Sequence, residues 1–447
     1  MKILYDISVL GLAQSNPLAR TGVARVVEHI LEELLLLEGI DLSLCTSFTQ
    51  LYPEQAAQYS IGILRGALSY RANNLNLKSI DLCHSPILTA LIQNTLENIK
   101  SLKIYEKTNS SHKNFLAQLA QVHQSLQQTL ISFQNLPWLF DSTELNNFDI
   151  FHATFYPIPF QIRKSHKIVK FLTVYDLIPI LYPQWFGNVE NERNSETLNT
   201  LDSKKDWVIC ISQATKNDLC NYLPSLDPAR VFVTHLAADF NKFYPCNNPE
   251  KLAKVKRKYK VPIGQYLLGL STLEPRKNLP HLVRCFAQTV LQQNLQDLSL
   301  VLVGNPGWEF KALIDEITQY QSSLKNRIIL TGRVEDEDLP ALYSGAVAFV
   351  YPSLYEGFGL PPLEAMCCGT PVITSNTSSL PEVVDNAALM VAPDDKDALC
   401  QYIYDLCTNV ELRQKLSAQG FVQAQNFSWK TAAKQTKSAY EFALSNC

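Results

Sequence analysis

The stretch that decides the fold is AVAFVYPSLYEGFGLPPLEAMCCGTPVITS, residues 346–375. It begins with a continuously apolar run, as strands buried on both faces of a parallel sheet do. A glycine-rich turn follows, and two prolines then stand where a helix would begin, in a first turn whose N–H groups need no partner. A second apolar run closes the stretch at 370–375. The order strand, turn, helix, strand indicates one βαβ unit of a parallel sheet.

The same alternation recurs along the whole chain. Apolar strand candidates alternate with helical patterns such as 23–37 and 278–293. A chain of 447 residues is too long for one compact core, so we expect two domains. We predict an α/β protein with two facing Rossmann-like, doubly wound domains, the first over 1–244 and the second over 245–425. A polar, proline-containing linker near 241–262 would join them.

Two segments stand apart from this alternation. Residues 87–135 carry little strand signal, and their apolar side chains recur at three- and four-residue steps from Leu116 to Phe133, which indicates an amphipathic helix. We expect a helical segment inserted in the first domain. It either packs on its own sheet or contacts an acceptor, a membrane surface or a second copy of the chain. Residues 426–447 are expected to form a C-terminal helix that packs back on the first domain.

Bulk composition excludes several classes of protein. The chain has 39 Lys and Arg against 42 Asp and Glu, a net charge of −3, so a nucleic-acid partner has no electrostatic support. No run approaches ~18 apolar residues, so we expect no transmembrane segment, and the start of the chain lacks the apolar core of a signal peptide. Eleven cysteines without CxxC pairs are typical of reduced, buried thiols. We expect a cytoplasmic protein, with a peripheral position at the inner face of the membrane left open.

The strongest candidate site residues follow strands in the second half. Ligands of open α/β sheets bind outside the carboxyl ends of the strands. Arg276 and Lys277 are adjacent at a strand-to-helix turn, where a planar fork and a compact charge would suit a diphosphate; solvated surface charges are the alternative. Glu356 and Glu364 flank the glycine turn. Carboxylates accept hydrogen bonds from sugar hydroxyls, although Glu364 could instead stabilise the dipole of a first helical turn.

Further candidates lie in the first half of the chain. Gly22 would let the backbone pass close to a ligand, or it marks an ordinary turn. His152 and Asp176 stand at strand ends, and a lone histidine is more often structural. Ser212 follows another strand but also fits a helix N-cap. No Cys/His cluster has zinc spacing, and the acidic run at 334–340 favours a helix start over a metal site.

Taken together, these stretches resemble the family 4 retaining glycosyltransferases, whose fold has two facing Rossmann-like domains (GT-B). The match is strongest over 265–393, where STLEPRKN, VGNPGW, TGRVEDEDLPALY, YPSLYEGFGLPPLEAMCCGTPVITSNTSSLPEVV and ALMVAPDD occur in the order of the family. The two glutamates with seven residues between them are very specific in this setting. The first half matches more loosely, through the glycine loop, the His152 strand and the segment ISQATKNDL.

The resemblance implies a role for each candidate residue. Arg276 and Lys277 would bind the donor diphosphate, Glu356 the hydroxyls of the donor sugar and Glu364 the ribose. The remaining donor contacts would come from the closing loop, from backbone near the base edge and from backbone amides of the glycine turn: Gly22, Ser212, Arg333, Val334, Gly357, Phe358, Gly359 and Leu360. His152 would contact the transferred sugar. Asp176 has no settled role, because Tyr175 precedes it where many relatives have histidine.

The resemblance also implies the reaction. A hexose would pass from a nucleotide-diphosphate sugar, GDP-mannose as first choice, to a hydroxyl of a glycan or glycolipid precursor in polysaccharide biosynthesis. The configuration would be retained, with no metal or other cofactor. The two glutamates do not fit a retaining glycosidase, whose carboxyl groups lie ~5–5.5 Å apart across one bond. A nucleotide-sugar epimerase or phosphorylase of the same fold, and a non-catalytic nucleotide-sugar-binding subunit, are the alternatives.

Overall fold

The computed structural model describes residues 1–10, 22–45, 145–186, 188–324 and 326–446. The first sheet has the order β2-β1-β3-β4-β5-β6, with all neighbours parallel. Its strands are β1 (Lys2–Asp6), β2 (Asp41–Cys45), β3 (Ile150–Ala153), β4 (Val169–Val174), β5 (Trp207–Cys210) and β6 (Val231–Val233). The predicted helical insertion at 87–135 lies outside the described residues.

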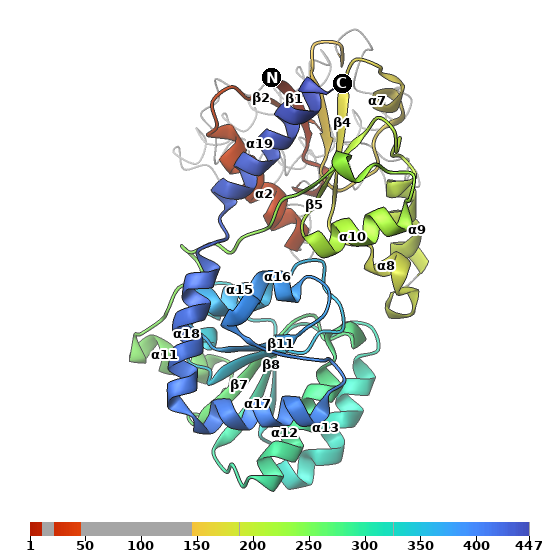
Figure 1. Cartoon of the computed structure of the whole chain (residues 1–447). Coiled ribbons are helices and arrows are strands. Elements are labelled where there is room, and N and C mark those ends of the chain that lie inside the picture. Colours follow the sequence, from red (N-terminus) through yellow and green to blue (C-terminus); the bar gives the residue numbers. More distant parts are fainter. Residues whose placement is uncertain (11–21, 46–144, 187, 325, 447) are drawn as a thin grey trace, which may run out of the picture.

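The second sheet has the order β12-β11-β10-β7-β8-β9 and is also parallel. Its strands are β7 (Gln265–Leu270), β8 (Leu298–Val303), β9 (Ile328–Gly332), β10 (Ala348–Tyr351), β11 (Val372–Ser375) and β12 (Leu389–Val391). Strands β4 and β8 are buried along their whole length, which is why their sequences are almost entirely apolar or small, Lys170 of β4 being the exception. The prediction of two doubly wound α/β domains is confirmed (Figure 1).

Helices connect the strands of each sheet. Those that belong to the first half of the chain are α2 (Gly22–Leu35), α7 (Phe160–Lys164), α8 (Ile178–Leu181), η2 (Pro183–Trp185), α9 (Asn188–Leu198), α10 (Gln213–Tyr222) and η3 (Pro228–Arg230). Those of the second half are α11 (Pro249–Lys258), η4 (Pro275–Lys277), α12 (Leu279–Gln292), α13 (Phe310–Leu324), α14 (Leu339–Ser344), α15 (Leu360–Cys367), α16 (Leu380–Val384), η5 (Asp385–Ala387), α17 (Lys396–Thr408), α18 (Val410–Ala424) and α19 (Trp429–Ser445).

The predicted linker near 241–262 is partly helical. Its basic run forms α11, because Asn248 caps the helix through bonds to the N–H groups of Glu250 and Lys251, and Pro249 occupies the first position. The three basic residues of the last turn suit the negative end of the helix dipole. The irregular connection between the domains therefore lies between β6 and α11.

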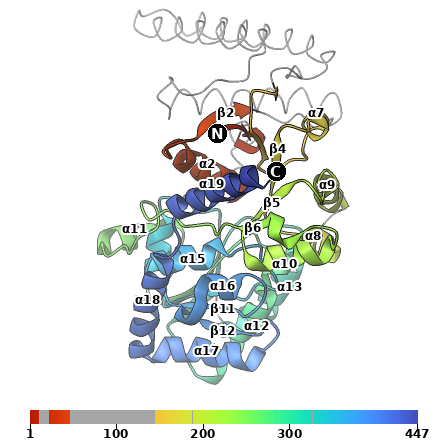
Figure 2. The ribbon, with the colours of Figure 1, turned by 45° about the horizontal axis from the view of Figure 1, so that its top comes forward.

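The last helix of the chain returns to the first sheet. Figures 1 and 2 both show α19 lying beside α2. Trp429 at its start stacks on His29 of α2 with ring centroids 5.0 Å apart. Further along, Tyr440 is fully buried, and its hydroxyl lies 2.5 Å from Nδ1 of His152. The helix therefore contributes to the core of the first domain, while the domain boundaries at 244 and 425 stay a prediction.

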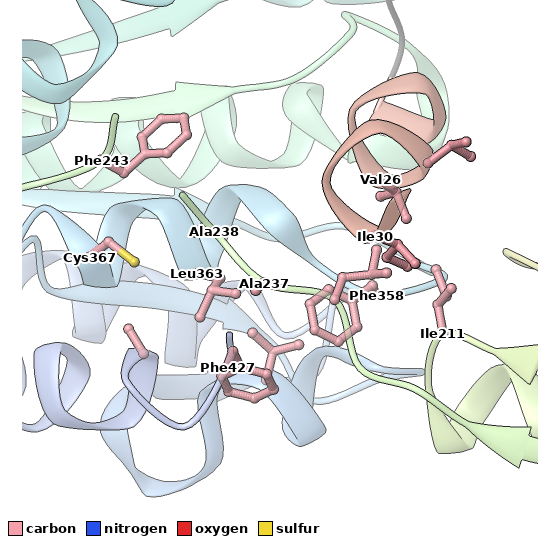
Figure 3. Packing of buried hydrophobic residues seen from close by; sticks show 14 of the residues in the cluster. Val26, Ile30, Ile211, Ala237, Ala238, Phe243, Phe358, Leu363, Cys367 and Phe427 are labelled. Carbon is pink, nitrogen blue, oxygen red and sulfur yellow. The ribbon is translucent and has the colours of Figure 1, made fainter. Parts of the chain in front are cut away.

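One hydrophobic cluster runs through both domains (Figure 3). Besides strand residues of both sheets, it holds residues of α2, of the connections after β5 and β6, and of the glycine turn and helices of the second domain. Among them are Val26, Ile30, Ile211, Ala237, Phe358, Leu363 and Phe427. Burial of apolar surface between the domains stabilises their packing. Among the described residues, none of the helices has both the length and the apolar character that a membrane crossing requires.

Candidate functional site

The turn after β7 places two cationic side chains at the carboxyl ends of the strands of the second sheet. Pro275 begins the short helix η4, and Asn278 ends it with a left-handed φ of 55°, which asparagine tolerates. The side chains of Arg276 and Lys277 are only 12% and 10% exposed. These two residues are therefore not solvated surface charges, which was the alternative interpretation of the sequence.

The turn after β10 faces them. Gly359 has a φ of 122°, which side chains rarely adopt, and it precedes α15 as its N-cap. Pro361 and Pro362 then occupy the first turn, as their missing N–H groups allow. This turn delivers Glu356 to the cations.

The carboxylate of Glu356 is the hub of the site. Its Oε1 accepts hydrogen bonds from Lys277 Nζ at 2.6 Å, the Tyr351 hydroxyl at 2.8 Å and the Ser353 hydroxyl at 2.6 Å. Its Oε2 accepts one from Arg276 Nη1 at 2.7 Å. Burial alone would raise the pKa of Glu356, but Arg276 and Lys277 outweigh it and lower the pKa to about 2. Glu356 is therefore an anion at neutral pH.

A second carboxylate completes this cluster. Glu274 Oε1 accepts a hydrogen bond from Arg276 Nη2 at 2.7 Å, and burial raises the pKa of Glu274. Two cations thus face two carboxyl groups, so their charges are nearly balanced. The Nε of Arg276 is buried and has no hydrogen-bond partner among the described residues. A buried N–H without an acceptor is costly, and a ligand oxygen would satisfy it.

The first domain adds Asp176 to the same site. Asp176 follows β4 and accepts a hydrogen bond from the N–H of Ile178 at 3.0 Å. Burial raises its pKa, while Arg276 counteracts that rise. Gly357 lies directly against this segment: a Cβ built on it would be 2.4 Å from the Tyr175 carbonyl oxygen and 3.4 Å from Asp176 Oδ2. The glycine therefore permits the two domains to meet beside Glu356.

Glu364 has a different environment from Glu356. It lies inside α15, beyond the first turn, which contains no acidic residue; the dipole interpretation of this glutamate is therefore wrong. The Tyr343 hydroxyl donates to its Oε2 at 3.1 Å, and Arg25 Nη1 of α2 lies 3.8 Å from its Oε1. Burial raises the pKa of Glu364 to about 7, against the opposing influence of Arg25.

Arg25 is a site residue that our sequence analysis missed. It stands three positions after Gly22, hence on the same face of α2, and its guanidinium reaches the second domain at Glu364. The side chain is 32% exposed. An arginine one turn after a glycine at a helix start was the available signal. Gly22 itself begins α2, and a Cβ built on it meets nothing within 4 Å in the described part of the chain beyond its own neighbours and helix backbone.

Two sequence candidates are not brought to this cluster. His152 is buried in β3, with Nδ1 at 2.5 Å from the Tyr440 hydroxyl and Nε2 at 2.7 Å from Thr173 Oγ1, and burial lowers its pKa to about 3. Both ring nitrogens are thus occupied, so we do not carry His152 into the proposed site, and its predicted contact with the sugar stays a prediction. Ser212 is fully buried and caps α10 by accepting from the Thr215 N–H at 3.0 Å, which is its alternative role.

The remaining candidates occupy different positions around the turn and β9. Phe358 is buried in the cluster shared by the domains, so only its backbone is placed for a ligand, and its carbonyl already lies 2.6 Å from the Ser379 hydroxyl. Leu360 begins α15. Arg333 is exposed and Val334 buried after β9. Asp338 stands at the N-cap of α14 and binds Lys258 Nζ at 2.6 Å, as expected of a helix start.

Comparison with known proteins places this geometry in context. Residues 254–423 match the model of the family "Glycosyl transferases group 1". O-antigen chain mannosyltransferase B of Escherichia coli is 33% identical over 65% of this chain and 74% of its own length. Serotype-specific mannosyltransferase WbdA of E. coli is 30% identical over 58% of this chain, which spans only 32% of that protein. Anabaena HepE, solved with UDP and glucose, superposes with a TM-score of 0.59 over 98% of both chains at 16% identity, a likeness of fold.

Proposed function

Because the chain belongs to the glycosyl transferases group 1 family and is a retaining glycosyltransferase of GT-B fold, we propose that it transfers a hexose from a nucleotide-diphosphate sugar to a hydroxyl of a glycan or glycolipid precursor. The observation that carries this proposal is the buried cluster of Arg276, Lys277 and Glu356 facing Asp176. Residues 1–244 would hold the acceptor and residues 245–425 the donor.

In the proposed site the cations bind the diphosphate. Charge builds up on the leaving diphosphate in the transition state, so fixed cations stabilise that state more than the ground state. The unpartnered Nε of Arg276 supplies a donor for one phosphate oxygen. Glu274 and Glu356 nearly balance the charges of Arg276 and Lys277, so further positive charge would have to come from elsewhere. We assign that role to Arg25 of the first domain, whose guanidinium reaches the second domain 3.8 Å from Glu364.

Glu356 would have two tasks. It fixes the positions of both cations, and it holds the donor sugar. Its Oε1 already accepts three hydrogen bonds, whereas Oε2 accepts one, so we assign the sugar hydroxyl to Oε2. Glu364, at the far end of the same turn and helix, would bind the ribose. Asp176 would contact the transferred sugar from the side of the first domain.

The proposed reaction is a front-face substitution at the anomeric carbon. The bond from that carbon to the diphosphate oxygen breaks, the bond to the acceptor oxygen forms on the same face, and the acceptor proton passes to a diphosphate oxygen. The protein positions the partners and stabilises an oxocarbenium-like state. This scheme gives Glu356 no nucleophilic role. The four hydrogen bonds that its carboxylate accepts favour that assignment, because they make its oxygens less nucleophilic.

The relatives guide the choice of substrates. Two of them are named mannosyltransferases, one of an O-antigen chain, so GDP-mannose and a growing mannose-containing glycan are our first choices. HepE, with UDP and glucose bound, makes UDP-glucose the second choice. The homodimer or membrane contact through 87–135 remains a separate proposal, because those residues lie outside the described part of the chain.

A donor screen tests the proposal. The melting temperature of the protein would be measured with GDP-, UDP- and dTDP-sugars, since a ligand that binds only the native state raises the free energy of unfolding by RT ln(1 + [L]/Kd). The donor that raises the melting temperature would then be incubated with oligosaccharide acceptors, and NMR would give the anomeric configuration of the product. We expect a glycoside with the same anomeric configuration as the donor sugar. Binding without transfer would favour the non-catalytic subunit, and an altered sugar without acceptor would favour the epimerase.

A further inference from the structure

A carboxylate of the second domain caps a helix of the first. The two oxygens of Glu382 in α16 accept hydrogen bonds from the backbone N–H groups of Gln213 and Ala214, each at 2.7 Å, at the start of α10. His235 Nε2 lies 3.2 Å from Oε2 of the same carboxylate. N–H groups in a first helical turn have no partner inside the helix, and the helix dipole favours a negative charge there. The charge that completes α10 therefore comes from the opposite domain.

The same helix contacts both flanks of Glu356. Thr215 Oγ1 of α10 lies 3.3 Å from the Gly357 carbonyl oxygen, and the Tyr355 hydroxyl lies 2.8 and 2.9 Å from the two oxygens of Asp218. Thr215 and Asp218 are three residues apart and share one face of the helix. Figures 1 and 2 both show α10 facing α16 across the boundary between the domains.

The start of α16 makes hydrogen bonds to the backbone of the turn between β10 and α15, which carries Glu356. The Glu356 N–H donates to Ser378 Oγ at 2.9 Å, and Ser379 Oγ lies 2.9 Å from the Glu356 carbonyl and 2.6 Å from that of Phe358. Glu382 follows three residues after Ser379 on the same short segment. The contact between α16 and α10 is thus connected by hydrogen bonds to the backbone of Glu356, the residue that binds both cations.

We propose that Glu382 is a positioning residue of the transferase reaction: it docks α10 of the first domain on α16 and thereby fixes the turn that carries Glu356. This inference rests on the proposed function of Glu356 at the donor. Glu382 would touch neither donor nor acceptor. It would act through Ser378 and Ser379, so its loss would affect transfer more than binding of the nucleotide to the second domain.

Glu382→Gln tests the proposal, because the variant keeps the shape but removes the charge and turns one acceptor into a donor facing an N–H group. We expect kcat at saturating donor to fall about tenfold or more, as small misplacements of reacting groups cause. The Kd of GDP or UDP should stay at its wild-type value. The radius of gyration from small-angle scattering should increase, and Glu382→Asp should restore part of kcat.

The matched control is Glu411→Gln, an exposed glutamate in the first turn of α18 in the same domain, which should behave as wild type. Wild-type kcat and radius of gyration in Glu382→Gln would overturn the proposal. The proposal would also be overturned if kcat falls only in proportion to a loss of folded protein while the radius of gyration stays unchanged. If the wild-type chain transfers no sugar, the proposed function fails, while the radius of gyration still decides whether Glu382 joins the domains.

Discussion

At the scale of the residue, the pKa values of two glutamates in one short segment are shifted in opposite directions. Glu356 meets Arg276 and Lys277 at hydrogen-bond distance, and its pKa falls to about 2. Glu364 accepts a hydrogen bond from Tyr343, its cation Arg25 lies farther away at 3.8 Å, and burial raises its pKa to about 7. Environments that separate the pKa values of neighbouring carboxyl groups are typical of functional sites. The pair is therefore suited to different parts of one ligand.

The raised pKa of Glu364 predicts a pH-dependent stability. The folded chain holds a proton on Glu364 up to about pH 7, whereas the unfolded chain loses it near 4.5, so stability falls as pH rises through this window. The cost above pH 7 is on the order of 3 kcal/mol. Glu364→Gln should therefore gain stability relative to wild type between pH 4.5 and 8, measured by denaturant unfolding. The exposed Glu411→Gln is the control, and a difference independent of pH would contradict the shifted pKa.

Arg276 and Lys277 predict coupled losses of binding. Arg276→Ala and Lys277→Ala should each weaken calorimetric binding of GDP or UDP and slow transfer further, because leaving-group charge grows in the transition state. The double variant should be non-additive, since both residues share Glu356 as a partner. Lys254→Ala on exposed α11 is the control. Wild-type affinity in both folded single variants would remove the diphosphate assignment.

At the scale of the element, the turn between β10 and α15 is shaped by its contact with the first domain. Gly357→Ala would place a Cβ 2.4 Å from the Tyr175 carbonyl and 3.0 Å from Asp176 Cβ, so the domains must separate beside Glu356. We expect a loss of transfer of about 10²-fold, with GDP or UDP binding to the second domain largely kept. Circular dichroism would verify folding. Full activity in this variant would show that the close approach is not needed for the reaction.

At the scale of the whole molecule, the last helix of the chain completes the core of the first domain. Tyr440→Phe would leave Nδ1 of His152 buried without its partner, which costs about 1–3 kcal/mol. The free energy of unfolding should fall by that amount, while kcat of the folded protein stays near wild type because His152 serves the core. Tyr222→Phe, exposed on α10, is the control for stability. If Tyr440→Phe instead lowers kcat strongly without changing stability, His152 takes part in the reaction and the expectation above is wrong.

The sequence by itself determined the class of fold and the part of the candidate site that lies in the second domain. Continuous apolar strands are buried between two layers of helices, and the residues of a strand–turn–helix unit such as 348–367 lie close together because the chain is short there. Glu356 and Glu364 were therefore visible as a pair, and Arg276 and Lys277 as neighbours. Local spacing also gave the prolines and Gly359 their positions.

Only the tertiary structure decided which distant residues meet. Arg25 meets Glu364, Glu382 meets Gln213, His152 meets Tyr440 and Asp176 faces Arg276, each across a hundred or more residues of chain, and no local pattern encodes such contacts. The sequence offered roles for His152 and Ser212 at strand ends, and only the structure showed that His152 is hydrogen-bonded in the core and that Ser212 caps a helix; their contacts with a sugar or donor stay predictions. The charges of the cations were evident from sequence, whereas their neutralisation by Glu274 and Glu356 required the packing of two turns against each other.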